Sequence, residues 1–143
     1  MSDDVRPIQR RHSRMKILGI VWVGVRTRLF ESMLGLFRDV MGLDVVHAED
    51  QFAVLQTANG DTVELFGEKS KYNPHFSSSS VVGFLVESIE SARDELVKNR
   101  TELIGDIEHG EDGYAWQHFV GPDGNIYEIV YDPSRLTSVK RNM

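Results

Sequence analysis

The sequence contains no cysteine among its 143 residues. This absence excludes disulfide bonds, thiolate metal sites and a cysteine nucleophile. It is typical of a reducing compartment, so we expect a cytoplasmic protein. The sequence also lacks any apolar run near the roughly 20 residues that span a bilayer, and it does not open with a signal-peptide pattern. We therefore expect no membrane partner.

The sequence also has fewer positively charged than negatively charged residues. Lysine and arginine number 16 against 22 aspartates and glutamates, which gives a net charge of −6. This balance argues against a nucleic-acid partner and suits a cationic small ligand, although many proteins are this acidic. The length and the hydrophobic fraction of 41% are typical of a single globular domain, which buries roughly 68% of its unfolded surface.

Both ends of the chain are polar and lack a repeating apolar pattern. We interpret residues 1–15 and 133–143 as tails on either side of a single domain at residues 16–132. The first tail carries a basic cluster, whose alternative interpretation is an arm that binds phosphate or nucleic acid. The members of this cluster are Arg10, Arg11, His12 and Arg14.

The first half of the domain, residues 16–67, predicts one strand, one helix and three further strands. The helix has an apolar stripe over Leu29–Met41, and Thr27 is its expected N-cap. Asn59-Gly60 is a strong hairpin signal before the last strand. The expected strands are Ile17–Arg26, Asp44–Ala48, Phe52–Thr57 and Thr62–Phe66.

Residues 68–80 contain Tyr72-Asn73-Pro74 and a run of serines, and we interpret them as a linker. The plan then repeats over residues 81–132. Ser88 is the expected N-cap of a second helix, whose apolar stripe is Ile89, Ala92, Leu96 and Val97. The expected strands are Val81–Val86, Thr101–Glu108 and the two arms of a hairpin over Trp116–Tyr131, which turns at Pro122–Asn125.

The order of one strand, one helix and three strands therefore occurs twice, and the two halves share residue patterns. The segment Asn59–Phe66 matches Asp123–Val130, with a glutamate at the same place in each, Glu64 and Glu128. Such internal similarity indicates a duplication. We predict an α+β fold in which two βαβββ modules form curved mixed sheets around a cleft.

Two segments of the chain are similar to those of a known group of proteins. Phe37–Leu43 resembles the helix ending, and Gly121–Glu128 the closing hairpin, of the vicinal oxygen chelate superfamily. That superfamily includes glyoxalase I, extradiol dioxygenases, fosfomycin-resistance enzymes and bleomycin-resistance proteins. The resemblance runs from about Ile17 to Asp132, and it implies a small-molecule ligand and a homodimer.

In the metal-using members of that superfamily, four positions face the cleft. One on the first strand of each module often holds histidine, and one on the last strand of each module often holds glutamate. Carried over, the last-strand positions are Glu64 and Glu128, whereas the first-strand positions hold Trp22 and Val81. Two glutamates alone make a poor transition-metal site, so we expect no metal cofactor. The alternative is a divalent metal held by Glu64, His118 and Glu128.

His118 joins these positions through the expected strand register. If Val120 pairs with Ile126 across the hairpin, His118 pairs with Glu128 on the same face. Three interpretations of this pair remain open: acid–base catalysis, a contribution to a metal site, or a histidine satisfied by a neighbouring carboxylate. The remaining histidines of the domain are expected to be solvated: His47, His75 and His109.

Glu64 and Glu128 are expected to converge in the cleft, where burial would raise the pKa of at least one of them. They would recognise a ligand, act as a general base or supply part of a metal site; the alternative is two surface glutamates. Trp22 is either an aromatic wall for a planar or cationic ligand or a side chain that fills space.

These residues support three hypotheses of function. The first is a small-molecule-binding protein of the glyoxalase/bleomycin-resistance type, with Trp22, Glu64, His118 and Glu128 at the ligand and without the usual histidine-containing metal site. The second is an enzyme, either a metal-dependent lyase or dioxygenase that uses Glu64, His118 and Glu128, or a metal-free acid–base catalyst that uses Glu128 and His118. The third is a structural or regulatory module without a reaction.

Overall fold

The computed structural model describes residues 15–136, and it has the predicted α+β architecture. The basic cluster of the first tail lies outside these residues. Along the chain the elements are β1 (Ile17–Thr27), α1 (Phe30–Gly35), η1 (Leu36–Val40), β2 (Asp44–Glu49), β3 (Phe52–Gln56), β4 (Thr62–Gly67), β5 (Val81–Val86), α2 (Ile89–Lys98), β6 (Glu102–His109), β7 (Ala115–Val120) and β8 (Ile126–Tyr131). None of the helices described is long and apolar enough to cross a membrane.

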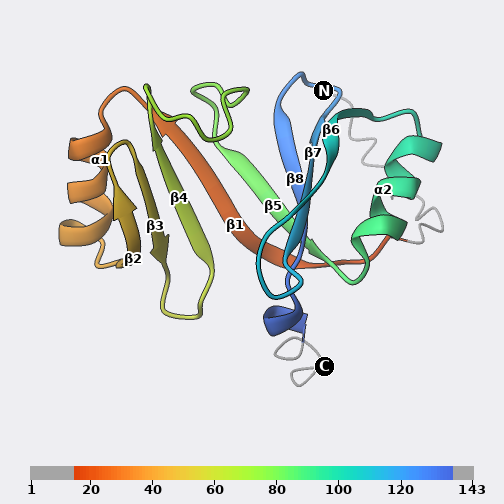
Figure 1. The fold of residues 1–143 in the computed structure, drawn as a ribbon, viewed down its shortest axis with the longest axis horizontal. Helices are drawn as coiled ribbons and strands as arrows, with labels where there is room; N and C mark the ends of the chain where they lie inside the picture. Colours follow the sequence, from red (N-terminus) through yellow and green to blue (C-terminus); the bar gives the residue numbers. More distant parts are fainter. Residues whose placement is uncertain (1–14, 137–143) are drawn as a thin grey trace, which may run out of the picture.

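The strands form one curved, eight-stranded sheet in the order β2-β3-β4-β1-β5-β8-β7-β6 (Figure 1). β1 pairs with β4 in parallel, β5 pairs with β8 in parallel, and β1 and β5 pair with each other antiparallel. The two predicted modules therefore join through their first strands within one chain. This pairing covers two strand edges that would otherwise be open to other chains.

Three apolar clusters hold the sheet. One lies under α1, one lies under α2, and a central cluster lies where β1 and β5 meet. Figure 1 shows α1 and α2 at opposite ends of the molecule, with the strands between them. The buried members of the central cluster are Val21, Trp22, Phe66, Phe76, Val81, Leu85 and Val130.

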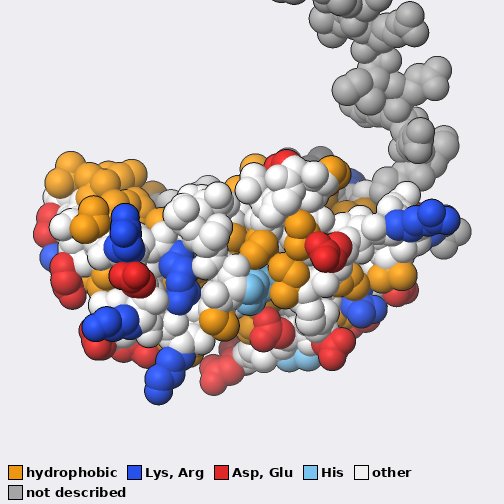
Figure 2. Space-filling model, turned by 90° about the horizontal axis from the view of Figure 1, so that it is seen from above, with side chains coloured by type: hydrophobic (Ala, Val, Ile, Leu, Met, Phe, Trp, Pro, Cys, Tyr) orange, Lys and Arg blue, Asp and Glu red, His pale blue; other side chains and the backbone are white. Residues whose placement is uncertain are grey.

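The first helix differs from its prediction. It begins at Phe30 after Leu29, and Thr27 does not cap it; the Thr27 hydroxyl instead accepts the Leu29 N–H at 3.0 Å and closes the preceding turn. The second part of the predicted stripe is the π-helical η1, in which Phe37 packs on the cluster under α1 but no residue is fully buried. Val40 and Met41 are 76% and 59% exposed, although the stripe predicts them to be buried. Figure 2 shows hydrophobic side chains gathered at this end of the molecule.

The second helix follows its prediction closely. The Ser88 hydroxyl caps it by accepting the Ser91 N–H at 3.2 Å. Ile89 and Ala92 are buried against the sheet, but Val97 is 51% exposed. Including Val97 in the stripe is wrong, because it is turned about 100° around the helix from the preceding residue, Leu96, which does pack on the cluster.

Residues 68–80 contain neither a helix nor a strand, as expected of a linker, but they are held firmly against the sheet. Arg26 on β1 donates to four of their carbonyl oxygens, at 2.8 Å to Ser70, 3.1 Å to Tyr72, 3.3 Å to Asn73 and 3.4 Å to Glu68. Phe76 is 4% exposed in the central cluster. Its ring meets Phe66 edge-on at 5.5 Å. The linker is therefore part of the core.

The start of the predicted C-terminal tail makes contacts with the first module. Residues 133–136 form a helical turn. Arg135 donates to the Gly60 carbonyl at 2.8 Å and pairs with Asp61 at 2.8 Å. These contacts attach the end of the second module to the Asn59-Gly60 hairpin of the first.

Candidate functional site

The concave middle of the molecule contains two connected spaces, here called the inner hollow and the outer cleft. The inner hollow has a volume of about 60 Å³ and is lined by Trp22, Glu64, Asn73, Tyr114, Trp116 and Glu128. The outer cleft has a volume of about 560 Å³ and shares Glu64, Asn73 and Trp116 with the hollow. Its other lining residues are Phe52, Phe66, Lys71, Tyr72, Pro74, His75 and Glu108.

The two glutamates reach the hollow from matching places in the two modules. Glu64 on β4 lies beside Gly24 of β1, and Glu128 on β8 lies beside Gly83 of β5. A Cβ atom at either glycine would collide with the side chain of Trp22. These two glycines therefore leave the space that the side chain of Trp22 occupies.

Trp22 faces the hollow and binds Glu64. Its indole N–H donates to Oε2 of Glu64 at 3.0 Å, and the side chain is only 4% exposed. The pairing of β1 with β5 is irregular between Ile20 and Trp22, and Val21 belongs to the same central cluster as Trp22. Trp22 both fills space and holds a carboxyl group.

His118 and Glu128 form the second pair. Val120 pairs with Ile126 and His118 with Glu128, so the predicted register is confirmed. The two side chains are buried, and 2.9 Å separates His118 Nε2 from Glu128 Oε2. Burial, and next the charge of Glu108, raise the pKa of Glu128 well above its ordinary value, whereas burial lowers the pKa of His118 to about 4. Both shifts favour the uncharged forms, so the pair shares one proton and carries no net charge.

Glu64 is less deeply buried than Glu128. Burial raises its pKa to about 7, although the hydrogen bond from Trp22 favours the ionised form. The expectation that burial raises the pKa of at least one of the glutamates is thus met at both. The hollow therefore holds one carboxyl group whose pKa lies at about 7, and a second whose protonated form burial favours more strongly.

His75 is a residue of this site that the sequence does not reveal. The sequence predicts a solvated side chain, but Nε2 of His75 lies 2.9 Å from Nδ1 of the buried His118. His75 remains exposed on its other side. Its only signal in the sequence is the neighbouring Phe76, an isolated apolar residue in a polar segment.

Three aromatic residues near the hairpin take different places. Tyr114 and Trp116 line the hollow, and burial raises the pKa of the Tyr114 hydroxyl. The Trp116 indole donates to Glu108 at 2.8 Å, so each module has one tryptophan that donates to a carboxyl group. Phe119 lies elsewhere and stacks on Tyr127 at 5.9 Å.

The donor groups of the site do not suit a divalent metal. Within residues 15–136, no three side chains of histidine, aspartate or glutamate lie close enough together to hold a metal ion. Glu64 is bound by an indole N–H, Glu128 is bound by His118, and burial favours the protonated form of both acids. A metal site needs deprotonated ligands that converge on one point.

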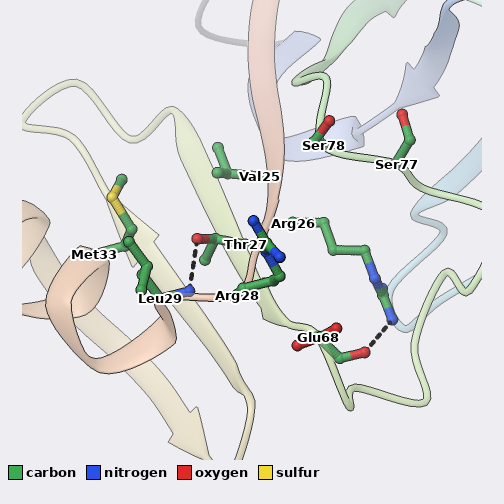
Figure 3. Close-up of a pocket in the computed structure, with 9 residues that line it drawn as sticks. All are labelled: Val25, Arg26, Thr27, Arg28, Leu29, Met33, Glu68, Ser77 and Ser78. Atoms are coloured by element: carbon green, nitrogen blue, oxygen red, sulfur yellow. Dashed lines mark hydrogen bonds between the residues drawn. The ribbon is translucent and has the colours of Figure 1, made fainter.

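A larger space of about 890 Å³ lies apart from this site, at the end of β1 (Figure 3). Val25, Leu29 and Met33 form its apolar side, and Ser77 and Ser78 lie across from them. The guanidinium of Arg26 turns away to the linker, where it is bound by carbonyl oxygens. This groove contains no residue of the inner hollow, so its size alone does not mark it as the functional site.

Known families and structures agree with this architecture. Residues 19–129 match the Glyoxalase/Bleomycin resistance protein/Dioxygenase superfamily. Comparison with curated protein sequences finds no match.

Three solved structures illustrate the likeness. The Mn(II)-bound glyoxalase from Novosphingobium aromaticivorans is 19% identical with a TM-score of 0.66, over 82% of this chain and 40% of that one. Methylmalonyl-CoA epimerase from Mycobacterium tuberculosis is 16% identical with a TM-score of 0.64, over 90% and 97% of the two chains. A superfamily member from Vibrio splendidus 12B01 is 19% identical with a TM-score of 0.59, over 82% and 99%. At such identities the likeness shows the fold alone. The family match and the fold together confirm the resemblance, and the chain belongs to the Glyoxalase/Bleomycin resistance protein/Dioxygenase superfamily.

Proposed function

We propose that this protein binds a small, flat, cationic molecule whose polar end enters the inner hollow. The observation that carries the proposal is the meeting of two buried carboxyl groups, Glu64 and Glu128, between aromatic walls in one hollow. A hollow of about 60 Å³ has room for a group of only a few atoms. The outer cleft, at about 560 Å³, is within the usual range of ligand pockets and would hold the rest.

The walls of the outer cleft suit a planar molecule. Phe52 lies 4.6 Å from Tyr72 and 5.3 Å from Phe66, as measured between ring centroids, and Trp116 lines the other side. Aromatic side chains bind flat apolar groups and cations through their faces. Part of this ligand surface therefore comes from the linker that carries Tyr72.

The charges of the cleft favour a cation. Glu64 and Glu108 line it together with a single lysine, Lys71. A bound cation stabilises the ionised form of Glu64, so binding lowers the pKa of this group and releases a proton. Because that pKa is about 7 in the free protein, affinity for a cation should rise as the pH increases through 7.

Two probes of the same shape and opposite charge test this proposal. Tryptamine should bind the protein, and indole-3-propionate, in which a carboxylate replaces the ammonium, should bind at least tenfold more weakly, which corresponds to about 1.4 kcal/mol. Glu64→Gln should remove this preference, whereas Glu68→Gln, at an exposed linker position, should retain it. Equal affinity of the wild-type protein for both probes, measured by NMR titration, would contradict the proposal.

A second candidate, metal-free acid–base catalysis, is favoured by the uncharged His118–Glu128 pair. Glu128 lines the hollow, and once it has passed its proton to His118 its carboxylate would accept a proton from a bound ligand. Bound carbonyl compounds would then exchange a neighbouring hydrogen for deuterium in D₂O. This exchange, measured by NMR, should disappear in Glu128→Gln; its persistence there would contradict the role of Glu128.

Several predictions from the sequence remain proposals of the same kind. We retain the division into modules 16–67 and 81–132 with the linker 68–80 between them, the cytoplasmic location and the absence of a nucleic-acid partner. We also retain the homodimer, which analytical ultracentrifugation of the purified protein would test directly.

A further inference from the structure

His75, His118 and Glu128 form a continuous line of hydrogen bonds from the surface to the inner hollow. His75 Nε2 lies 2.9 Å from His118 Nδ1, and His118 Nε2 lies 2.9 Å from Glu128 Oε2. His75 is exposed, whereas His118 and Glu128 are 2% and 3% exposed. Both nitrogens of the buried imidazole are therefore engaged, one toward the hollow and one toward the solvent side.

The two rings are held in this arrangement by a third. Phe76 meets His75 edge-on at 5.0 Å and His118 edge-on at 5.0 Å. The linker segment that carries His75 and Phe76 is fixed in turn by Arg26, which donates to the Asn73 carbonyl. The contact between the histidines is thus built into the core and does not depend on a free surface loop.

When these groups are uncharged, each hydrogen bond along the line has a defined donor and acceptor. A protonated Glu128 donates to His118 Nε2, so the hydrogen of the neutral His118 ring is on Nδ1 and is donated to His75 Nε2. The hydrogen of His75 is then on Nδ1, which faces away from His118. Burial lowers the pKa of both histidines, and the charge of Glu108 opposes this at each ring. Arg26 also lowers the pKa of His75, and Glu64 also raises that of His118.

We propose that His75, His118 and Glu128 form a proton relay that connects the inner hollow with solvent. Outward, Glu128 gives its proton to His118 Nε2, His118 gives its Nδ1 proton to His75 Nε2, and His75 gives its Nδ1 proton to water. Glu128 is then a carboxylate, and both rings remain neutral with their hydrogen on Nε2. Inward, a proton from water enters at His75 Nδ1 and every step reverses. No ring has to turn.

This relay would supply the proton that ligand binding or acid–base chemistry at Glu128 requires, so its purpose rests on the proposed function. Its existence does not, because it can be measured without a ligand.

The test is the rate at which the ring N–H of His118 exchanges with water, measured by NMR on the histidine-labelled protein without ligand. His75→Gln can accept the His118 Nδ1–H through its amide oxygen, but an amide cannot pass a proton on by changing tautomer. We expect His75→Gln to slow the exchange at least tenfold at an unchanged melting temperature. His47→Gln is the control, because His47 is an exposed histidine that also lies beside a carboxylate, Glu49, at 2.7 Å.

A purely structural role for His75 predicts the opposite result, with exchange in His75→Gln as fast as in the wild type. That result would overturn the relay while leaving the binding proposal intact. If His75→Gln fails to fold, the wild-type protein decides the question through its tautomers. The relay requires the hydrogens of both rings to move from Nδ1 to Nε2 at the pH at which Glu128 ionises, and rings that change independently would overturn it.

Discussion

The two modules place a glutamate at the same point of the same strand and give it opposite surroundings. Glu64 receives a hydrogen bond from the indole of Trp22, a group that only donates. Glu128 faces the imidazole of His118, a group that both donates and accepts, and it is almost fully buried. One module therefore holds a carboxyl group whose pKa is about 7, and the other holds one whose pKa burial raises well above its ordinary value. The same position in the two modules thus holds acids with different hydrogen-bond partners and different burial.

The largest expected effect comes from a variant that disrupts the His118–Glu128 pair. His118→Ala removes the partner of a buried carboxyl group and leaves a cavity beside β8, which should cost about 3 kcal/mol of unfolding free energy. Urea unfolding at pH 7 measures this loss. His47→Ala, at an exposed position of β2, should change stability by less than about 0.5 kcal/mol. Similar losses in both variants would remove the distinction drawn here between a buried pair and a surface pair.

The next prediction concerns how the free energy of unfolding depends on pH through the titration of Glu64. Its pKa is about 7 in the folded state and 4.5 in the reference state, so the folded protein binds more protons between these values. The Glu64 contribution is therefore complete below pH 4.5 and is lost as the pH rises to 7, by at most about 3 kcal/mol. His118, whose pKa is lowered, acts with the opposite sign over pH 4 to 6.5, so the total can be flat.

The useful measurement is accordingly a difference between two proteins. Unfolding free energies of the wild type and of Glu64→Gln should diverge steadily from pH 4.5 to 7, with the wild type losing stability relative to the variant. Most of the His118 contribution cancels in this difference; the part that remains is the rise in the His118 pKa caused by the charge of Glu64. A constant difference over this range would show that the pKa of Glu64 is not raised.

A smaller effect compares the two indole donors. Trp22→Phe keeps an aromatic ring but removes the N–H that favours ionised Glu64, so the pKa of Glu64 should rise further and stability at pH 7 should fall by about 1 kcal/mol. Trp116→Phe removes the corresponding donor to Glu108, which is exposed, and should cost less. ¹³C NMR of the glutamate carboxyl groups measures the pKa change in each variant, and urea unfolding at pH 7 measures the loss of stability. Equal costs would mean that the two modules hold their tryptophans in the same way.

Most of the sheet and half of the site could be predicted from the sequence, because both depend on local patterns. The turn at Pro122–Asn125 fixes the hairpin register, and the register alone places His118 opposite Glu128. The contribution of His75 could not be predicted in this way. Its position depends on how Arg26 and Phe76 fold the linker back over the sheet, and such long-range contacts leave no periodic signal.

The π-helical turn of η1 is a second feature without a local signal. The spacing of apolar residues through Met41 is that of an ordinary helix, and only the chain path into β2 shows that the last turn is wider. A misjudged helix end changes which side chains are exposed but leaves the site untouched. The linker, in contrast, carries His75, a residue of the proposed relay that the sequence predicts to be solvated.

The smallest expected effect on stability comes from a variant that should change pKa values in one module only. The charge of Glu108 raises the pKa of Glu128, His118 and His75. Glu108→Gln keeps an oxygen that can accept the Trp116 N–H, so stability should change by less than about 0.5 kcal/mol.

All three pKa values should nevertheless fall together in this variant, because the same negative charge is removed from the neighbourhood of all three groups. Without it, the carboxylate of Glu128 forms more easily and the two imidazolium forms are less favoured. The pKa of Glu64, in the other module, should stay in place. NMR titration of the histidine rings and glutamate carboxyl groups measures the four values in one series. If Glu64 moves as far as Glu128, the two acids share one electrostatic environment, and the difference between the modules comes from their hydrogen-bond partners alone.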